Sequence, residues 1–322
     1  MTLPPLRGLS ITYQSDDFPA GTIANDVRTL QFTWDELLWA AVTIGRPNQH
    51  YVFQHGRASA FEALFRWSMV RMALEQSGPH GYTLRRTDAF KALDPTEKGA
   101  VNYFLGMAIC KLFAARLLDT PWLLHLDVFR AHLSPQLLGR SRPDLVGEGH
   151  GTGGWHAFEC KGRASAPGET EKAKAKAQAQ RLISVQGTAC TLHIGSIAYF
   201  HNDVLQFYWR DPPPREGRAL DLPEIKDGWR HYYSPIVDVI RNARDRRLIS
   251  VEVGQFVPIE GLDIAASIHP YVAEYLFKAD WAGARAAAKK MKEELAKAGF
   301  QPDGLAIRSG PSWRLPFEEN QA

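Results

Sequence analysis

The sequence predicts an α/β protein with a central α/β core, a mostly helical N-terminal region and a mixed C-terminal extension. Three observations predict this class. Residues 94–119 carry apolar side chains at helical spacing, residues 122–161 contain three short strand-like segments, and residues 189–209 contain two more after a helix-forming stretch. The expected order of elements in the core is therefore a helix, three strands, a helix and further strands. We expect its boundaries near 93/94 and 210/211.

Composition excludes several classes without pointing to a function. Of 322 residues, 45% are hydrophobic and 23% are charged, which is typical of soluble globular proteins and not of disordered chains, collagens or coiled coils. The formal net charge of +3 neither requires nor excludes a polyanionic partner, because the local distribution of charge matters more than its sum.

Two helices are expected in the N-terminal region. Thr33 and Glu36 have the spacing of a capping box at the start of a helix over 34–42. A second helix is expected over 59–76. Its apolar stripe is assigned to the core and comprises Phe61, Leu64, Phe65, Met69 and Met72.

The core begins with the clearest helix, which opens at Asp94-Pro95 or Thr96 and ends near Asp119. Strands are expected over 122–129, 142–146 and 155–161, and the glycine-rich turn at 147–154 makes the last two an antiparallel hairpin. A helix over 169–185 and strands over 189–200 and 204–209 follow. The extension should contain a helix near 235–247, a strand over 248–257, a helix over 280–298 and a strand at 303–307.

The sequence also predicts an intracellular environment. Cys110, Cys160 and Cys190 are too few and too dispersed for a disulfide framework. The N-terminus lacks the apolar segment of a secretory signal. The longest apolar stretch, 103–118, is shorter than the roughly 20 residues that cross a bilayer. We expect a soluble, cytoplasmic protein without membrane association.

The chemistry-bearing residues lie on the predicted hairpin. Asp144 follows Pro143 at one strand, and Glu159 and Lys161 lie two apart on the next, so their side chains share a face. Two carboxylates with waters and a substrate phosphate suit Mg²⁺, which prefers hard oxygen ligands. A lysine beside the metal can orient the attacking water or stabilise charge. The backbone carbonyl of Cys160 is a further candidate ligand, with its thiol pointing away.

These residues, in this order of elements, resemble the PD-(D/E)xK nuclease superfamily. The resemblance covers residues 94–210 and implies a restriction-endonuclease-like fold. It implies that Asp144 and Glu159 bind Mg²⁺, for which Mn²⁺ can substitute, and that Lys161 is the catalytic lysine. Many members place an acidic residue on the preceding helix. Glu97 is the candidate here for a catalytic and metal-binding role, but its first-turn position suits the helix dipole equally well.

The chain contains internal controls for this motif. Pro302-Asp303 has no Glu-x-Lys after it, and Glu224-Ile225-Lys226 lies in a proline-flanked loop without a strand pattern. Only the pair at 143–161 lies on expected strands in the expected order.

Basic residues follow the motif. Between residues 161 and 181, six basic residues and two acidic residues give a local charge of +4. One interpretation is a track for the phosphate backbone, and the other is the solvated face of an Ala/Lys helix. The candidate nucleic-acid-binding residues are Arg163, Lys172, Lys174, Lys176, Gln178 and Arg181; Gln178 is also the candidate polar residue that some superfamily members carry on this helix.

The expected function is metal-dependent hydrolysis of phosphodiester bonds in nucleic acid, with DNA as the expected substrate, in restriction, anti-phage defence or repair. The alternative is a nucleic-acid-binding or scaffold subunit that keeps the fold without turnover. A third interpretation is a subunit completed by a partner in a multi-gene system. A homodimer would be a natural way to cut two strands with one site per chain.

Overall fold

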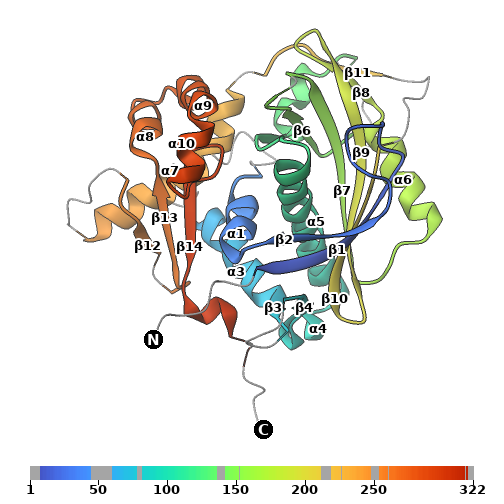
Figure 1. Cartoon of the computed structure of the whole chain (residues 1–322), viewed down its shortest axis with the longest axis horizontal. Coiled ribbons are helices and arrows are strands. Elements are labelled where there is room, and N and C mark those ends of the chain that lie inside the picture. The colour runs from blue at the N-terminus through green and yellow to red at the C-terminus, as the bar shows by residue number, and fades with distance from the viewer. Residues whose placement is uncertain are drawn as a thin grey trace.

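The computed structural model describes residues 8–44, 60–77, 82–135, 142–151, 153–211, 219–225, 227–247, 254–259, 261–315 and 317. It shows a mixed α/β protein with a large sheet on one side and a smaller sheet with its own helices on the other (Figure 1). Buried apolar side chains from both parts belong to one continuous core.

The first half of the chain contains β1 (Leu9–Asp16), β2 (Val27–Phe32), α1 (Trp34–Val42), α3 (Ala60–Ala73), β3 (Leu74–Gln76), β4 (Leu84–Arg86), α4 (Asp88–Ala92), α5 (Pro95–Leu117), β5 (Leu123–His125) and the 3-10 helix η2 (Leu126–His132). The second half contains β6 (Leu145–Glu148), β7 (Trp155–Arg163), α6 (Glu169–Ala179), β8 (Leu182–Val185), β9 (Thr188–His201), β10 (Val204–Arg210), β11 (Leu220–Leu222), α7 (Gly228–Arg247), β12 (Val257–Ile259), β13 (Ile264–Ile268), α8 (Pro270–Phe277), α9 (Trp281–Lys290), α10 (Lys292–Lys297), β14 (Leu305–Ser309) and η3 (Pro311–Arg314).

The large sheet follows the order β2-β1-β10-β9-β7-β6-β5. β5, β6 and β7 are successive antiparallel neighbours, whereas β7 and β9 run parallel. A parallel pair needs a crossover connection, which α6 provides. The element order expected between residues 94 and 210 is therefore the order observed, and the expected hairpin is confirmed as β6–β7.

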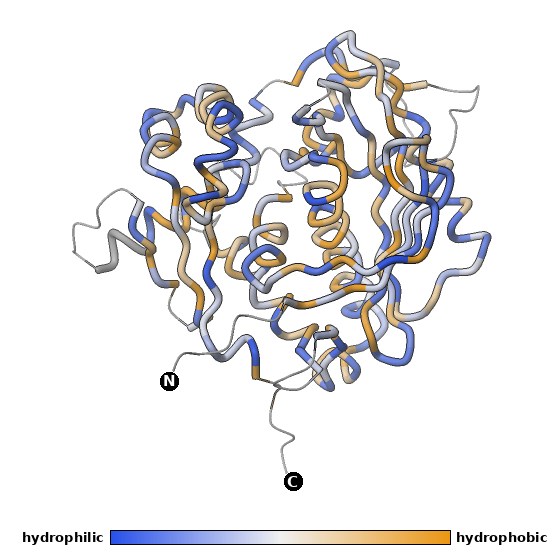
Figure 2. Tube along the Cα trace, in the orientation of Figure 1, coloured by the Kyte–Doolittle hydropathy of each residue, from blue (hydrophilic) through white to orange (hydrophobic). Residues whose placement is uncertain are grey.

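Helices cover both faces of this sheet. α5 lies against one face and α6 against the other (Figure 1). Figure 2 shows hydrophobic residues along much of α5 and hydrophilic residues along much of α6. Among the described residues α5 is the one helix long and apolar enough to span a membrane, and 67% of its most apolar window is buried inside the protein. That burial is consistent with the core helix of a soluble protein.

The expectation of a mostly helical N-terminal region was wrong in part. β1 and β2 form an antiparallel pair, and β1 also pairs in parallel with β10, so these two strands extend the large sheet. Leu9, Ile11 and Tyr13 are buried at every second position, which is the period of a strand with one covered face.

The expected apolar stripe of α3 was also wrong in part. Phe61 and Phe65 are 55% and 61% exposed, because the face of α3 that meets the core carries Ala63, Trp67 and Val70 instead. Met69 of the expected stripe is buried, and the two phenylalanines remain at the surface.

Several element boundaries differ from expectation. The strand expected over 122–129 ends at His125, where η2 begins, and the strand expected over 142–146 is β6, over 145–148. α6 ends at Ala179, and residues 182–185 form β8 instead of a last helical turn. The expected helix over 280–298 divides at Met291 into α9 and α10. Most of the strand expected over 248–257 lies outside the described residues.

Candidate active site

β7 sends alternate side chains to opposite faces of the sheet. Cys160 is fully buried on the face that α5 covers, where its thiol lies beside Cys110. Glu159 and Lys161 therefore belong to the other face. There Gly195 of β9, the partner of Glu159, lies so close to α6 that a Cβ on it would approach the Lys176 amide nitrogen to 2.7 Å.

Asp144 is held at the start of β6 by three backbone-linked hydrogen bonds. Its amide donates to the Phe158 carbonyl at 2.9 Å, its carbonyl accepts from the Leu126 amide at 2.8 Å, and Oδ2 accepts from the Cys160 amide at 2.9 Å. Leu145 pairs with Phe158, so Asp144 and Glu159 are the next residues on either strand of the hairpin. The structure therefore brings these two carboxylates to one place.

The Glu159 side chain is 1% exposed, and its two carboxylate oxygens differ in their contacts. Oε1 forms an ion pair with Lys161 Nζ, whereas the buried Oε2 makes no hydrogen bond to any described residue. The pKa of Glu159 is raised to about 8, because burial and then the charge of Asp144 raise it by more than Lys161 lowers it. A proton or a cation at Oε2 would offset the cost of burying this carboxylate.

The surroundings of the pair keep Lys161 protonated. Its side chain is 39% exposed. Burial lowers the pKa of Lys161, but the charge and hydrogen bond of Glu159 and the charge of Asp144 more than offset this, so the pKa is raised overall. Burial also raises the pKa of Asp144, while the Cys160 amide and Lys161 lower it.

The residues present fit a hard divalent cation with few protein ligands. Asp144 and Glu159 supply carboxylate oxygens, one of which is unsatisfied. The N–H and C=O of a strand residue point to the same strand edge, so the Cys160 carbonyl faces the edge where its amide meets Asp144. The described residues contain no group of three or more His, Cys, Asp and Glu able to hold a metal. Mg²⁺ accepts such a set, since it retains several waters.

Glu97 does not join this group. It is the third residue of α5 and completes a capping box: its amide donates to Asp94 Oδ1 at 3.2 Å, and Oε2 accepts from the Asp94 amide at 3.4 Å. The described residues contain no metal-holding group that includes Glu97, so its observed contacts are those of the helix-end interpretation.

The candidate nucleic-acid-binding residues lie on and around α6. Arg163 pairs with Glu171 at 3.1 Å, and Lys172 pairs with Glu169 at 2.8 Å while lying 4.5 Å from the ring centre of Tyr208. The remaining candidates include the exposed Lys174 and the partly buried Lys176, Gln178 and Arg181. Four of these six candidates belong to α6, the helix that covers the Glu159 face, and Arg163 and Arg181 lie before and after it.

Other residues near the pair carried no motif in the sequence. Asp127 forms an ion pair with Arg142, and the charges of both act on the pKa of Asp144. The Tyr103 hydroxyl lies 3.3 Å from His125 Nε2, and burial followed by the charge of Asp144 raises the pKa of Tyr103. They come from α5, β5, η2 and the residues before β6, and tertiary packing brings them together, so no spacing pattern marks them.

The two histidines on these strands are buried and neutral. His125 is 3% exposed, and burial lowers its pKa to about 4. His156 contacts Thr120 Oγ1 through Nδ1 at 2.9 Å, and burial likewise lowers its pKa to about 4. Neither is positioned as a charged group at the carboxylate pair.

Comparison of the chain with protein-family models, with curated proteins and with solved structures finds no match.

Proposed function

We propose that this protein is a Mg²⁺-dependent nuclease that hydrolyses phosphodiester bonds, with DNA as its substrate. One observation carries the proposal: the buried Glu159 keeps an unsatisfied oxygen beside Asp144, with the Lys161 ammonium on its other oxygen. A buried, unpartnered carboxylate oxygen is costly in a purely structural hairpin, and a bound cation offsets that cost.

The arrangement of elements supports the same proposal. The run α5, β5, β6, β7, α6, β9 has the order that the PD-(D/E)xK resemblance implies. The motif residues occupy neighbouring strands of it, in a hairpin whose β7 strand pairs in parallel with β9. We therefore assign the restriction-endonuclease-like core to residues 94–210, with residues 1–93 and 211–322 as additions to it.

The chain's own groups divide the work of hydrolysis. Mg²⁺ when bound lowers the pKa of water and stabilises charge on the phosphate, and Mn²⁺ substitutes for it. Asp144 and Glu159 would hold the ion, with the Cys160 carbonyl as a further ligand. Lys161 keeps its proton, so its ammonium orients the attacking water and offsets negative charge that builds on the phosphate oxygens.

The setting of the reaction follows from other features. Cys110, Cys160 and Cys190 are free and buried, which supports a reducing cytoplasmic environment. The basic residues around α6 form a path for the phosphate backbone. We place the activity in restriction, anti-phage defence or repair, where a homodimer or a partner subunit would supply the second cut.

Incubation with linear, circular and single-stranded DNA and with RNA, in Mg²⁺ or Mn²⁺, tests the proposal. Wild-type protein should cleave at least one DNA form, EDTA should stop the reaction, and Asp144→Ala and Lys161→Ala should each slow it by on the order of 100-fold or more. Undiminished cleavage by both variants contradicts the assignment. Binding by the wild type that is unaffected by EDTA and gives no product identifies the non-catalytic alternative.

A further inference from the structure

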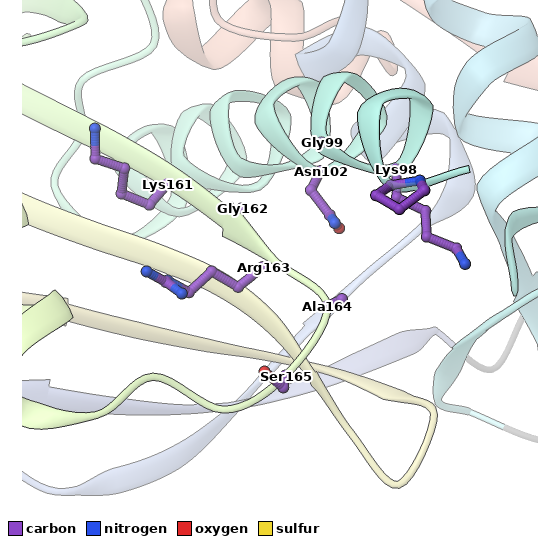
Figure 3. A pocket seen from close by; sticks show the side chains of 9 residues that line it. Lys98, Gly99, Asn102, Lys161, Gly162, Arg163, Ala164 and Ser165 are labelled. Carbon is purple, nitrogen blue, oxygen red and sulfur yellow. The ribbon is translucent and has the colours of Figure 1, made fainter. Parts of the chain in front are cut away.

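A pocket of about 470 Å³ opens beside the candidate active site (Figure 3). Lys98 and Asn102 line it from the first turns of α5, and Lys161, Arg163 and Ser165 line it from β7 and the residues after it. Lys161 therefore belongs both to this pocket and to the Asp144–Glu159 site. Nothing in the hydrolysis described above requires Lys98, Asn102 or Ser165.

The floor of the pocket is unusually close-packed. A Cβ on Gly162 would lie 1.6 Å from the Asn102 carbonyl oxygen, and one on Gly106 would lie 2.6 Å from the Lys161 carbonyl. The backbones of α5 and β7 thus touch directly. The residues after β7 are held as well, because Arg86 donates from a terminal guanidinium nitrogen to the Ala164 carbonyl at 3.3 Å.

Asn102 is a polar residue of the pocket whose side chain lacks a hydrogen-bond partner among the described residues. The residue is 6% exposed, and its carboxamide makes no hydrogen bond to a described residue. Figure 3 shows this side chain projecting from α5 toward the end of β7 and the segment that follows. The residue lines the pocket, so a molecule bound there can form the hydrogen bonds that this amide lacks within the described part of the protein.

The charges around the pocket favour an anion. Three cationic residues line the pocket, but Lys161 and Arg163 send their side chains toward the α6 side of β7, so Lys98 is the cation that projects from α5. Arg163 is paired with Glu171 and Lys161 with Glu159, whereas Lys98 forms no ion pair within the described part of the chain. The nearby acidic residues Asp94 and Glu97 are engaged in the helix cap. Lys98 and Asn102 are thus the available cation and the available amide.

We propose that this pocket binds a backbone phosphate of the nucleic-acid substrate at a position removed from the phosphate that is cut. The inference rests on the proposed nuclease function and names where that substrate is held. Glu159 and Arg163 are four residues apart, or about 13 Å along the strand. A phosphate held at this end of β7 is therefore a different phosphate from the one beside Glu159. The bound phosphate accepts from Asn102 and Ser165 and pairs with Lys98.

Fluorescence anisotropy with a fluorescein-labelled DNA oligonucleotide, single-stranded and duplex, measures this contact in EDTA, where no cleavage occurs. Lys98→Glu should raise Kd about tenfold or more and reduce the salt dependence by about one phosphate contact, equally for different sequences. Asn102→Asp should weaken binding in the same way. Lys297→Glu reverses an exposed charge on α10 and should leave Kd unchanged. Asn102 is buried, so Asn102→Asp can unfold the protein. In that case the Kd of Lys98→Glu, at a half-buried residue, is the deciding measurement.

The outcomes separate this inference from the proposed function. If Kd responds to Lys98→Glu but wild-type protein cleaves nothing in Mg²⁺, the pocket stands and the nuclease assignment fails. Cleavage by wild-type protein with the same Kd for Lys98→Glu overturns the pocket alone, and absence of oligonucleotide binding overturns both. Inorganic phosphate serves as a separate probe: thermal stabilisation by phosphate that Lys98→Glu abolishes, with oligonucleotide Kd unchanged, assigns the pocket to a small anion and overturns the inference.

Discussion

Glu159 and Asp211 are buried carboxylates in different chemical situations. Asp211 lies directly after β10, where Oδ1 accepts from the His193 amide at 2.6 Å. Glu159 keeps Oε2 without a partner among the described residues. Burial raises the pKa of both, to about 6 for Asp211 and to about 8 for Glu159. Asp211 is suited to a structural role, and Glu159 to binding a cation.

The pH dependence of stability should reveal Asp211. Its folded-state pKa lies above its ordinary value of 3.8, so the folded state binds the proton more tightly than the unfolded state. Its contribution to the free energy of unfolding is therefore present below about pH 4 and is lost as pH rises toward 6. Asp211→Asn, which can still accept from His193, should gain about 2 kcal/mol relative to wild type between pH 4 and pH 7. Urea unfolding at both pH values measures this, and an equal difference at both contradicts it.

At the residue scale, the sequence predicted the proximity of the motif residues because they are close along the chain. Asp144, Glu159 and Lys161 lie on adjacent strands of one hairpin, so spacing and period were enough to place them near each other. For Glu97 the sequence left two interpretations open, and its observed contacts are those of the capping box at the start of α5. Tyr103, Asp127 and Arg142 could not be found, since they approach Asp144 through packing between separate elements.

At the scale of elements, α5 and β7 form the contact that positions both the candidate site and the pocket. Gly162 and Gly106 let the two backbones meet without side chains between them. The glycine after Glu-Cys-Lys thus has a packing role that the motif does not express. The helix and strands themselves were predictable from periodicity, whereas this contact and the parallel pairing of β1 with β10 join distant parts of the chain.

Gly162→Ala should weaken this contact. The added Cβ would lie 1.6 Å from the Asn102 carbonyl oxygen, so α5 must move away from β7, and we expect a loss of about 2 kcal/mol or more in the free energy of unfolding. Gly99→Ala is the matched control. It lies on α5 with open space around it, and should be stabilising by about 0.5–1 kcal/mol because alanine favours the helix. Melting temperatures that fall equally in both variants would show that the close approach is unimportant.

At the scale of the whole molecule, a buried polar network joins the large sheet's helices to the smaller sheet. The Tyr232 hydroxyl of α7 accepts from Lys111 Nζ of α5 at 2.9 Å and donates to Asp303 Oδ2 at 2.7 Å. Trp39 of α1 also donates to Asp303 Oδ2, at 2.7 Å. Lys111 and Asp303 are both fully buried. Burial lowers the pKa of the lysine, and the charge of Asp303 raises it.

Tyr232→Phe should lower the stability of the folded protein, because it breaks this network. It removes the hydroxyl between a buried lysine and a buried aspartate, and should cost about 2 kcal/mol in the free energy of unfolding. Tyr271→Phe, at an exposed tyrosine, should cost little. Chemical unfolding followed by tryptophan fluorescence measures both, and equal stability of the two variants would argue against a structural role for the network.

The central claim, that a metal held by Glu159 and Asp144 cuts phosphodiester bonds, is tested most directly by the single-turnover cleavage rate of Glu159→Gln in Mg²⁺. The matched control is Glu224→Gln, which changes the exposed glutamate of the other Glu-x-Lys sequence. We predict that Glu159→Gln cleaves on the order of a thousandfold more slowly, whereas Glu224→Gln cleaves at the wild-type rate. Wild-type cleavage by Glu159→Gln would contradict the account.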